Sequence, residues 1–280
     1  MTTIVFLHGR GQEGKDPKAM LEKWRAALAA GLGAATLSVP AVLPYYGNVL
    51  HRVTAQTARR VDILDLPPGG EEEEMPFHPF MPEDVGELER RLLADLAAGA
   101  GVPQEMMGLT DVLSWTMARR LLTWLSRNTS VDKEIIKIFL QDVAVYLSRG
   151  RQPVLDEVRR FLPATGPIVL VSHSLGTVVA RDLLVDEPLR RRVTFWVTAG
   201  SPLGMPTIQR NLLAKGTRHP GMPWLTAYDV NDIVALGHPL DGAWGTPLSQ
   251  VEVENRDEPH DIERYLRHDA VAGPIGRACA

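Results

Sequence analysis

The segment from residue 168 to residue 184 constrains the fold more than any other part of the chain. It opens with four aliphatic residues, Ile168-Val169-Leu170-Val171, and passes through Ser172-His173-Ser174-Leu175-Gly176 into an apolar run with helical spacing. A continuous aliphatic run is typical of a strand buried on both faces, as in the centre of a parallel sheet. The segment therefore predicts a buried strand, a sharp turn at Ser174 and a helix.

A turn between a strand and a helix can hold a serine on a strained backbone with its hydroxyl exposed. Small residues are needed two positions before and after that serine, because the strand and the helix approach each other there. Ser172 and Gly176 meet this need. The pattern resembles the nucleophile elbow of the α/β-hydrolase superfamily, with Ser172 in place of the usual first glycine. The alternative is a turn whose serine only caps the helix.

Composition narrows the class of protein. The 280 residues are 45% hydrophobic, enough for a large core, and length alone allows one domain or two. The net charge of −4 gives no basic field for nucleic acid. The single cysteine, Cys279, excludes an internal disulfide framework and a cysteine-based metal cluster. No stretch is long enough to span a membrane, and the N-terminus lacks a signal-peptide pattern, so we expect a cytoplasmic protein without a stable membrane anchor.

The first predicted strand, residues 4–7, ends in a glycine-rich loop that formally fits two nucleotide sites. Gly9, Gly11 and Gly14 have the spacing of a dinucleotide fingerprint, and the run from Gly9 to Lys15 spells most of a P-loop. A dinucleotide site needs a helix that begins within the glycines, whereas Asp16-Pro17 is the better helix start. Asp16 also stands where a P-loop needs a Ser or Thr for Mg²⁺, and its charge would repel phosphate. Both nucleotide sites are therefore disfavoured.

The pair His8-Gly9 at a strand end instead resembles the first oxyanion loop of α/β hydrolases. In that family the residue after the pair donates its backbone N–H, which here is Arg10. The residue after the nucleophile donates a second N–H, which here is Leu175. His8 itself is expected to be structural, because it stands at the buried end of a strand.

Strand and helix patterns alternate along most of the chain. Further strands are predicted at residues 35–40, 193–198, 224–229 and 250–254, and an amphipathic helix at residues 17–31. Helical patterns without strands fill residues 83–98, 109–127, 131–148 and 153–161. Because such insertions commonly cap the site in α/β hydrolases, the resemblance implies one domain over residues 1–280 with a helical cap or lid at residues 76–128. The segment 109–125 is apolar around most of its circumference, which fits either a buried helix or an apolar acyl pocket.

Polar residues follow several predicted strands in the order Ser174, Asp232, His260. A parallel sheet would bring these positions to one edge, and the order is that of the α/β-hydrolase triad. Asp229 is the alternative acid, ranked second because it is assigned to the strand. Among the eight histidines, His260 is preferred because it lies in a loop after the last strand and before a helix. His173, His238 and His268 are less well placed.

The strand end Ala199-Gly200-Ser201-Pro202-Leu203-Gly204 also resembles lipase and esterase members of this superfamily. The resemblance implies an α/β-hydrolase fold and a serine hydrolase that cleaves an acyl ester through an acyl-enzyme, without a cofactor. The expected partner is a small acyl ester with an apolar acyl part. Two alternatives stay open: a thioesterase or phospholipid acyl hydrolase with the same residues, and a binding protein of this fold without turnover.

Overall fold

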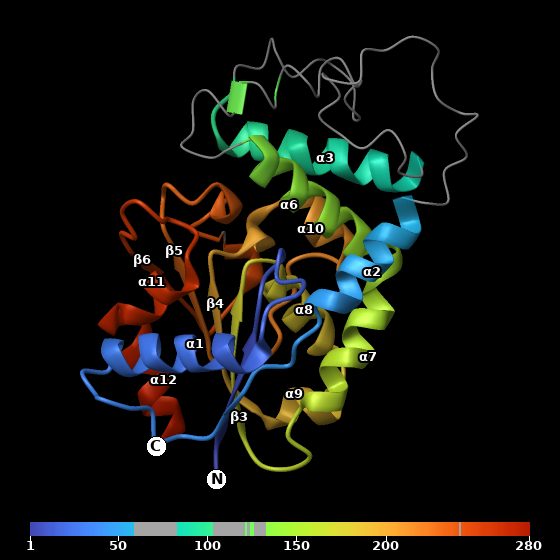
Figure 1. The fold of residues 1–280 in the computed structure, drawn as a ribbon. Helices are drawn as coiled ribbons and strands as arrows, with labels where there is room; N and C mark the ends of the chain where they lie inside the picture. Colours follow the sequence, from blue (N-terminus) through green and yellow to red (C-terminus); the bar gives the residue numbers. More distant parts are fainter. Residues whose placement is uncertain (59–82, 103–120, 122–123, 126–132, 241) are drawn as a thin grey trace, which may run out of the picture. The chain divides into compact units, whose positions relative to one another are not determined.

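The structure is a computed structural model, and it describes residues 1–58, 83–102, 121, 124–125, 133–240 and 242–280 (Figure 1). The chain divides into two compact units, Met1–Gly47 with Leu155–Ala280, and Asn48–Val154. The predicted cap at residues 76–128 falls within the second unit and is described only in part. The arrangement of one domain with a cap stays a prediction.

A six-stranded sheet forms the centre of the first unit. The strand order is β2-β1-β3-β4-β5-β6, and every neighbouring pair is parallel. The predicted α/β class with a parallel central sheet is therefore confirmed. The strands are β1 (Thr3–Leu7), β2 (Ala41–Val42), β3 (Ile168–His173), β4 (Val193–Ala199), β5 (Trp224–Tyr228) and β6 (Leu248–Glu252).

Helices pack against both faces of this sheet (Figure 1). Helices α1 (Pro17–Gly31), α11 (Ile262–Arg267) and α12 (Asp269–Cys279) share one core with the sheet, in which Phe6 meets Trp24 edge to face at 5.4 Å. Helix α8 (Leu175–Leu183) packs against β1 and β3. All six residues of β3 are buried, as the aliphatic run predicts. The other elements of this unit are α7 (Arg151–Phe161, from Leu155 onward), α9 (Glu187–Arg192), α10 (Pro206–Asn211), η4 (Pro202–Gly204), η5 (Ile233–Ala235) and η6 (Gly242–Trp244).

The loop before α1 confirms the predicted helix start. Asp16 caps the helix, because its Oδ1 accepts the backbone N–H of Lys18 at 2.9 Å, and Pro17 is the first helical residue. The glycines at 9, 11 and 14 therefore all precede the helix. A dinucleotide fingerprint needs the opposite arrangement, with the helix beginning within the glycines.

The strand predicted at residues 35–40 is wrong, and the second strand is the shorter Ala41–Val42. Its pairing with β1 begins at Ala41, opposite Ile4. The guanidinium of Arg25 donates hydrogen bonds to the carbonyl oxygens of Leu37 and Val39, at 2.7 and 3.2 Å. Those carbonyls bind an arginine of α1 instead of a neighbouring strand, which a local sequence pattern does not reveal. Helix α2 begins shortly after β2, at Gly47.

Helices make up the described part of the second unit. They are α2 (Gly47–Ala58), α3 (Glu83–Gly99), α6 (Lys133–Val145), the π-helical turn η3 (Tyr146–Gly150) and the first residues of α7. Helix α3 packs against α6, and Arg149 pairs with Asp84 at 2.9 Å. The helix predicted at residues 109–127 lies outside the described residues except at Leu121, Trp124 and Leu125. Among the helices that the structure describes, none has both the length and the apolar character to cross a membrane.

Candidate active site

Ser174 stands on the predicted sharp turn between β3 and α8. Its backbone has φ 55° and ψ −130°, a conformation that residues other than glycine seldom adopt, and its N–H donates to the carbonyl of Ala199 at 3.1 Å. A Cβ atom at Gly176 would overlap the carbonyl oxygens of Leu7 and His8. The close approach of helix and strand therefore requires glycine at position 176, as the sequence pattern predicts.

Ser172, which occupies the position of the usual glycine, is fully buried, and its hydroxyl both donates and accepts a hydrogen bond. Its hydroxyl donates to the carbonyl of Val197 at 2.9 Å and accepts the indole N–H of Trp196 at 3.0 Å. The Trp196 ring stacks on Trp224 with their centroids 4.5 Å apart. The extra side chain at position 172 thus fits this turn because a tryptophan of the neighbouring strand is its hydrogen-bond partner.

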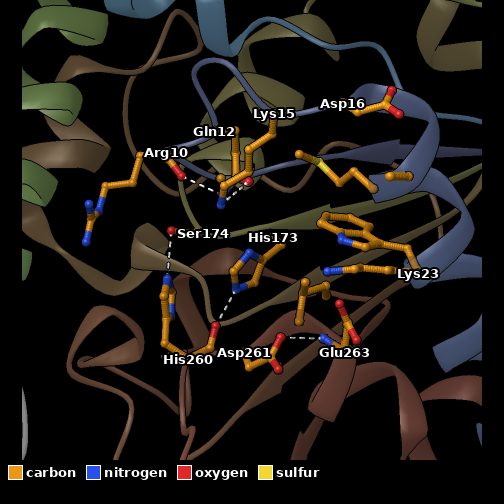
Figure 2. A pocket seen from close by; sticks show the side chains of 16 residues that line it. Arg10, Gln12, Lys15, Asp16, Lys23, His173, Ser174, His260, Asp261 and Glu263 are labelled. Atoms are coloured by element: carbon orange, nitrogen blue, oxygen red, sulfur yellow. Dashed lines mark hydrogen bonds between the residues drawn. The ribbon is translucent and has the colours of Figure 1, made fainter.

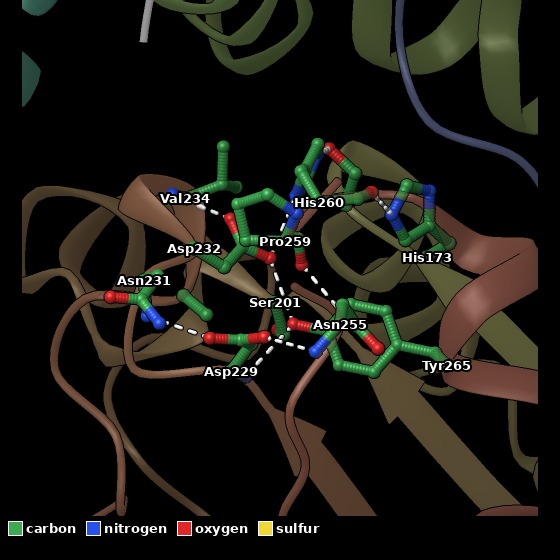
Figure 3. Close-up of polar contacts among 12 residues, drawn as sticks. His173, Ser201, Asp229, Asn231, Asp232, Val234, Asn255, Pro259, His260 and Tyr265 are labelled. Carbon is green, nitrogen blue, oxygen red and sulfur yellow. Dashed lines mark hydrogen bonds and ion pairs between the residues drawn. The ribbon is translucent and has the colours of Figure 1, made fainter. Parts of the chain in front are cut away.

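Ser174, His260 and Asp232 are connected by two hydrogen bonds. His260 Nε2 lies 2.9 Å from Ser174 Oγ (Figure 2), and His260 Nδ1 lies 2.8 Å from Asp232 Oδ2 (Figure 3). Since the Asp232 carboxylate only accepts, Nδ1 carries the hydrogen of the neutral ring and Nε2 faces the serine as an acceptor. The structure therefore brings the three residues together in the geometry of a proton relay.

Two further donors hold the Asp232 carboxylate, which has no exposed surface. The Tyr265 hydroxyl donates to Oδ2 at 2.9 Å, and the backbone N–H of Val234 donates to Oδ1 at 3.0 Å. Burial raises the pKa of Tyr265 far above its usual value, with the negative charge of Asp232 as the next cause. The phenol is therefore a permanent hydrogen-bond donor that orients the carboxylate.

Asp229, the alternative acid, has a different set of partners (Figure 3). Its carboxylate accepts the backbone N–H groups of Asn231 at 2.8 Å and Asn255 at 2.6 Å. It does not bind His260; instead it ties the end of β5 to the segment after β6. The assignment of Asp229 to the strand is wrong, because β5 ends at Tyr228. Hydrogen bonding, and not the strand boundary, separates the two aspartates.

Gly200 is a site residue that the sequence analysis did not single out. It has φ +54°, and a Cβ atom there would lie 2.7 Å from Asp232 Oδ2 and 3.1 Å from His260 Nδ1. Any side chain at this position would displace the contact between the carboxylate and the imidazole. The strand end at residues 199–204 was a signal for this position, although its role follows only from the contact.

His173 is a second residue that the sequence analysis set aside. Its Nε2 lies 2.8 Å from the backbone carbonyl oxygen of His260, and the two rings are 4.6 Å apart (Figure 2). A carbonyl oxygen can only accept, so Nε2 carries the hydrogen. His173 therefore contacts the backbone of His260, while His260 contacts Ser174 through its ring.

His8 is structural, as predicted, and it orients the backbone next to Ser174. Its Nε2 accepts the backbone N–H of Tyr46 at 3.0 Å, so Nδ1 carries the hydrogen and donates to the carbonyl of Gly9 at 2.6 Å. Burial lowers the pKa of His8 to about 4, so the ring is neutral near pH 7. In a trans peptide the N–H points opposite to the carbonyl. The N–H of Arg10 is therefore directed away from the His8 ring.

Gly9 and the start of α8 place the two predicted oxyanion donors beside the serine. A Cβ atom at Gly9 would lie 2.8 Å from the Cβ of Ser174, so the backbone runs directly against the serine there. Leu175 is buried and is the first residue of α8, where a backbone N–H has no acceptor within its own helix. The peptide groups that carry the N–H of Arg10 and of Leu175 thus both adjoin Ser174.

A cavity of about 540 Å³ opens beside Ser174, His173 and His260 (Figure 2). The loop at residues 9–16, helix α1 and residues 260–263 form its walls, and the apolar part includes Met20, Trp24 and Ile262. Charged side chains share the lining, namely Arg10, Lys15, Asp16, Lys23, Asp261 and Glu263. The described walls thus combine apolar surface with charges of both signs. The segment 109–125, expected to be either a buried helix or an apolar acyl pocket, lies almost wholly outside the described residues.

Within the described ranges, no three His, Cys, Asp or Glu side chains are grouped so as to hold a metal ion. The chemistry that the described groups can perform is proton transfer along Ser174, His260 and Asp232. The interpretation of the site depends on this geometry, because comparisons of the chain with protein-family models, curated proteins and solved structures found no match.

Proposed function

We propose that the protein is a serine hydrolase that cleaves a carboxylic ester through an acyl-enzyme intermediate. The observation that carries the proposal is the pair of hydrogen bonds that link Ser174 to His260 and His260 to Asp232, at 2.9 and 2.8 Å. A serine hydroxyl is a weak nucleophile until a base removes its proton. The base in turn needs a carboxylate that fixes its tautomer and stabilises its charge.

In the proposed reaction, Ser174 Oγ attacks the carbonyl carbon of the ester while His260 Nε2 takes the serine proton. The N–H groups of Arg10 and Leu175 stabilise the negative charge that develops on the carbonyl oxygen. His260 then protonates the leaving oxygen, the bond from carbon to that oxygen breaks, and the alcohol departs. A water molecule, deprotonated by His260, then attacks the acyl carbon. The bond from that carbon to Ser174 Oγ breaks, His260 returns the proton to Ser174, and the acid departs.

The fixed backbone around the serine supports this assignment of roles. Preorganised donors stabilise a developing charge without reorganising during the reaction. The neutral His8 ring holds the carbonyl of Gly9, and thereby the plane of the peptide that carries the N–H of Arg10. The strained φ of Ser174 is supported by the bond from its N–H to Ala199. Both features keep polar groups in place next to the nucleophile.

The charged lining of the cavity favours a polar substrate. Lys15, Lys23 and Glu263 would all be desolvated by a long alkyl chain laid across the described walls, which is costly for charged groups. Met20 and Trp24 offer apolar contact over a shorter length. We therefore expect water-soluble esters with short acyl groups to be turned over faster than long-chain esters.

A fluorophosphonate probe tests the nucleophile directly. We expect one covalent adduct at Ser174, detected by intact mass and peptide mapping, and none in Ser174→Ala. His260→Ala should slow labelling by several orders of magnitude, because the serine is then not deprotonated. Lys18→Ala, an exposed position on α1 outside the cavity lining, is the control and should label like the wild type.

A substrate panel then separates the related functions. It comprises p-nitrophenyl acetate, butyrate and octanoate, an acyl thioester and a short-chain phosphatidylcholine. Fastest turnover of the thioester or of the phospholipid would redirect the assignment to those activities. Absence of both labelling and turnover would contradict the proposed enzyme and favour a binding protein of this fold.

A further inference from the structure

Helix α11 contributes residues to two separate cavities. Ile262 and Glu263 line the cavity at Ser174, whereas Arg264 and Arg267 line another of about 210 Å³. The remaining walls of this second cavity are the segment after β6 and the residue that follows α11, namely Glu254, Asn255, Arg256 and His268. The two cavities share no lining residue. The reaction proposed for Ser174 uses no residue of the second cavity.

Positive charge dominates the second cavity although the chain as a whole carries −4. Arg264 pairs with Glu258, whose Oε2 lies 3.1 and 3.0 Å from its Nε and Nη2. In the part of the chain that the structure describes, the guanidinium groups of Arg256 and Arg267 have neither an ion pair nor a hydrogen bond. Glu254 is the one carboxylate of the described lining. Two exposed arginines therefore line the cavity without a bound partner.

The backbone of Arg256 has a positive φ, as does that of Ser174. These are the two described residues other than glycine with a positive φ, 57° for Arg256 and 55° for Ser174. A side chain in this conformation persists only where its surroundings enforce it. At Ser174 the strain accompanies the proposed nucleophile. Arg256 lines the second cavity at a position where glycine would adopt the same φ without strain.

The bonds of Asn255 hold the turn that carries Arg256. The backbone N–H of Asn255 donates to Asp229 at 2.6 Å, and its side-chain N–H donates to the carbonyl of Pro259 at 2.9 Å. Its Oδ1 lies 3.1 Å from His268 Nε2 across the cavity lining. These hydrogen bonds hold this wall of the cavity in place before any ligand binds, which lowers the entropic cost of binding.

We infer that this second cavity binds the phosphoryl group of a small anion, with Arg256 and Arg267 as its principal donors. A guanidinium presents paired N–H groups that match phosphate oxygens, and a phosphoryl dianion can accept from more than one arginine. Arg264 supplies further positive charge beside them, partly offset by Glu258 and Glu254. The site is independent of the proposed hydrolysis at Ser174.

Titration of the full chain with inorganic pyrophosphate, followed by calorimetry at low ionic strength, tests the site. We expect saturable binding at one site, weakened by about tenfold or more in Arg256→Gly and in Arg267→Gln, because each removes a charge-assisted hydrogen bond. Glu254→Gln should strengthen binding by about threefold, because it removes a like charge near the anion. Arg277→Gln on α12 removes the same charge outside the cavity and should leave the affinity unchanged.

Further controls separate the site from the fold and from the other cavity. Arg256→Gly should unfold at the wild-type temperature or above it, because glycine adopts φ 57° without strain. Ser174→Ala should bind pyrophosphate normally, so the two proposals can fail separately. Loss of binding in Lys23→Gln, but not in Arg256→Gly, would move the anion to the Ser174 cavity and overturn the inference.

The source of the phosphoryl group is tested in a parallel arm with neutral vesicles that contain or lack phosphatidic acid. Binding of pyrophosphate alone indicates a soluble phosphate compound. Binding only to the phosphatidic acid vesicles, lost in Arg267→Gln, indicates a lipid headgroup. No saturable binding in either arm would overturn the assignment.

Discussion

His173 Nε2 lies 2.8 Å from the backbone carbonyl oxygen of His260, so the histidine before the proposed nucleophile supports the proposed base. Burial lowers the pKa of His173 well below 6.5, and repulsion from the His260 ring, when that ring is protonated, lowers it further. His173 therefore stays neutral when His260 takes up a proton. A neutral donor holds the loop in place without adding positive charge next to the imidazolium.

This relationship predicts that His173→Leu lowers kcat by about a hundredfold. Without the hydrogen bond from His173, the His260 ring can shift relative to Ser174, and even a small misplacement of a catalytic group slows the reaction strongly. His173→Gln can place an N–H near the same carbonyl and should recover part of the loss. Steady-state kinetics and circular dichroism on both variants check this. Equal activity of His173→Leu and the wild type would contradict the supporting role of the bond.

Gly200→Ala should reduce kcat by about a hundredfold or more, because its Cβ would enter the contact between Asp232 and His260 at 2.7 and 3.1 Å. Gly216→Ala is the matched control. Gly216 has φ +83° with no atom within 4 Å of its added Cβ, so alanine there imposes backbone strain alone. We expect Gly216→Ala to lower the unfolding temperature while its kcat stays near that of the wild type.

Substitution of the two aspartates should have different effects: Asp232→Asn should lower activity, and Asp229→Asn should lower stability. Asp232→Asn removes the charge that stabilises protonated His260, so kcat should fall by about a thousandfold or more. Asp229→Asn weakens the bonds to the N–H groups of Asn231 and Asn255, and we expect a loss of about 1–3 kcal/mol in the free energy of unfolding. Urea unfolding and ester turnover, measured on both variants, distinguish the roles. A larger loss of kcat in Asp229→Asn would reverse the assignment.

Ser172→Gly restores the usual elbow sequence, and it should cost stability without improving turnover. The variant leaves the buried indole N–H of Trp196 without its acceptor, at about 1–3 kcal/mol. The turn at Ser174 is already formed with serine at position 172, so kcat should change little. Chemical denaturation together with the rate of fluorophosphonate labelling tests both parts.

Buried His8 predicts a loss of stability in acid. Its pKa is about 4 in the folded protein and 6.5 in the unfolded chain, so the unfolded chain binds more protons between these values. The contribution of neutral His8 is complete above pH 6.5 and is lost as the pH falls toward 4. The difference corresponds to roughly 3.5 kcal/mol at most, at about 1.4 kcal/mol for each unit of pKa.

His8→Gln keeps a neutral polar side chain and removes this titration. The free energy of unfolding of the variant should therefore fall less steeply between pH 6.5 and 4 than that of the wild type. Carboxylates titrate in the same range in both proteins, so the difference between the two curves isolates His8. Parallel curves would show that His8 is not buried as a neutral ring.

The sequence by itself determined the buried strand before Ser174, the sharp turn, the helix after it and the α/β class. It also indicated Asp232 and His260, because the carboxyl ends of parallel strands share one edge of a sheet. These features depend on local patterns of hydrophobicity and turn residues. For that reason the aliphatic run of β3 and the cap at Asp16 were predictable without coordinates.

Only the tertiary structure decided which aspartate binds His260, and it also decided the roles of Gly200 and His173. Each depends on a contact between segments far apart in the chain, such as Gly200 against Asp232 and His260. The prediction of a strand at residues 35–40 was wrong for the same reason. Arg25 of α1 donates hydrogen bonds to carbonyl oxygens in this segment that a strand would pair with its neighbour. Hydrogen bonds between residues far apart in the chain thus decide local structures and residue roles that the local sequence pattern does not determine.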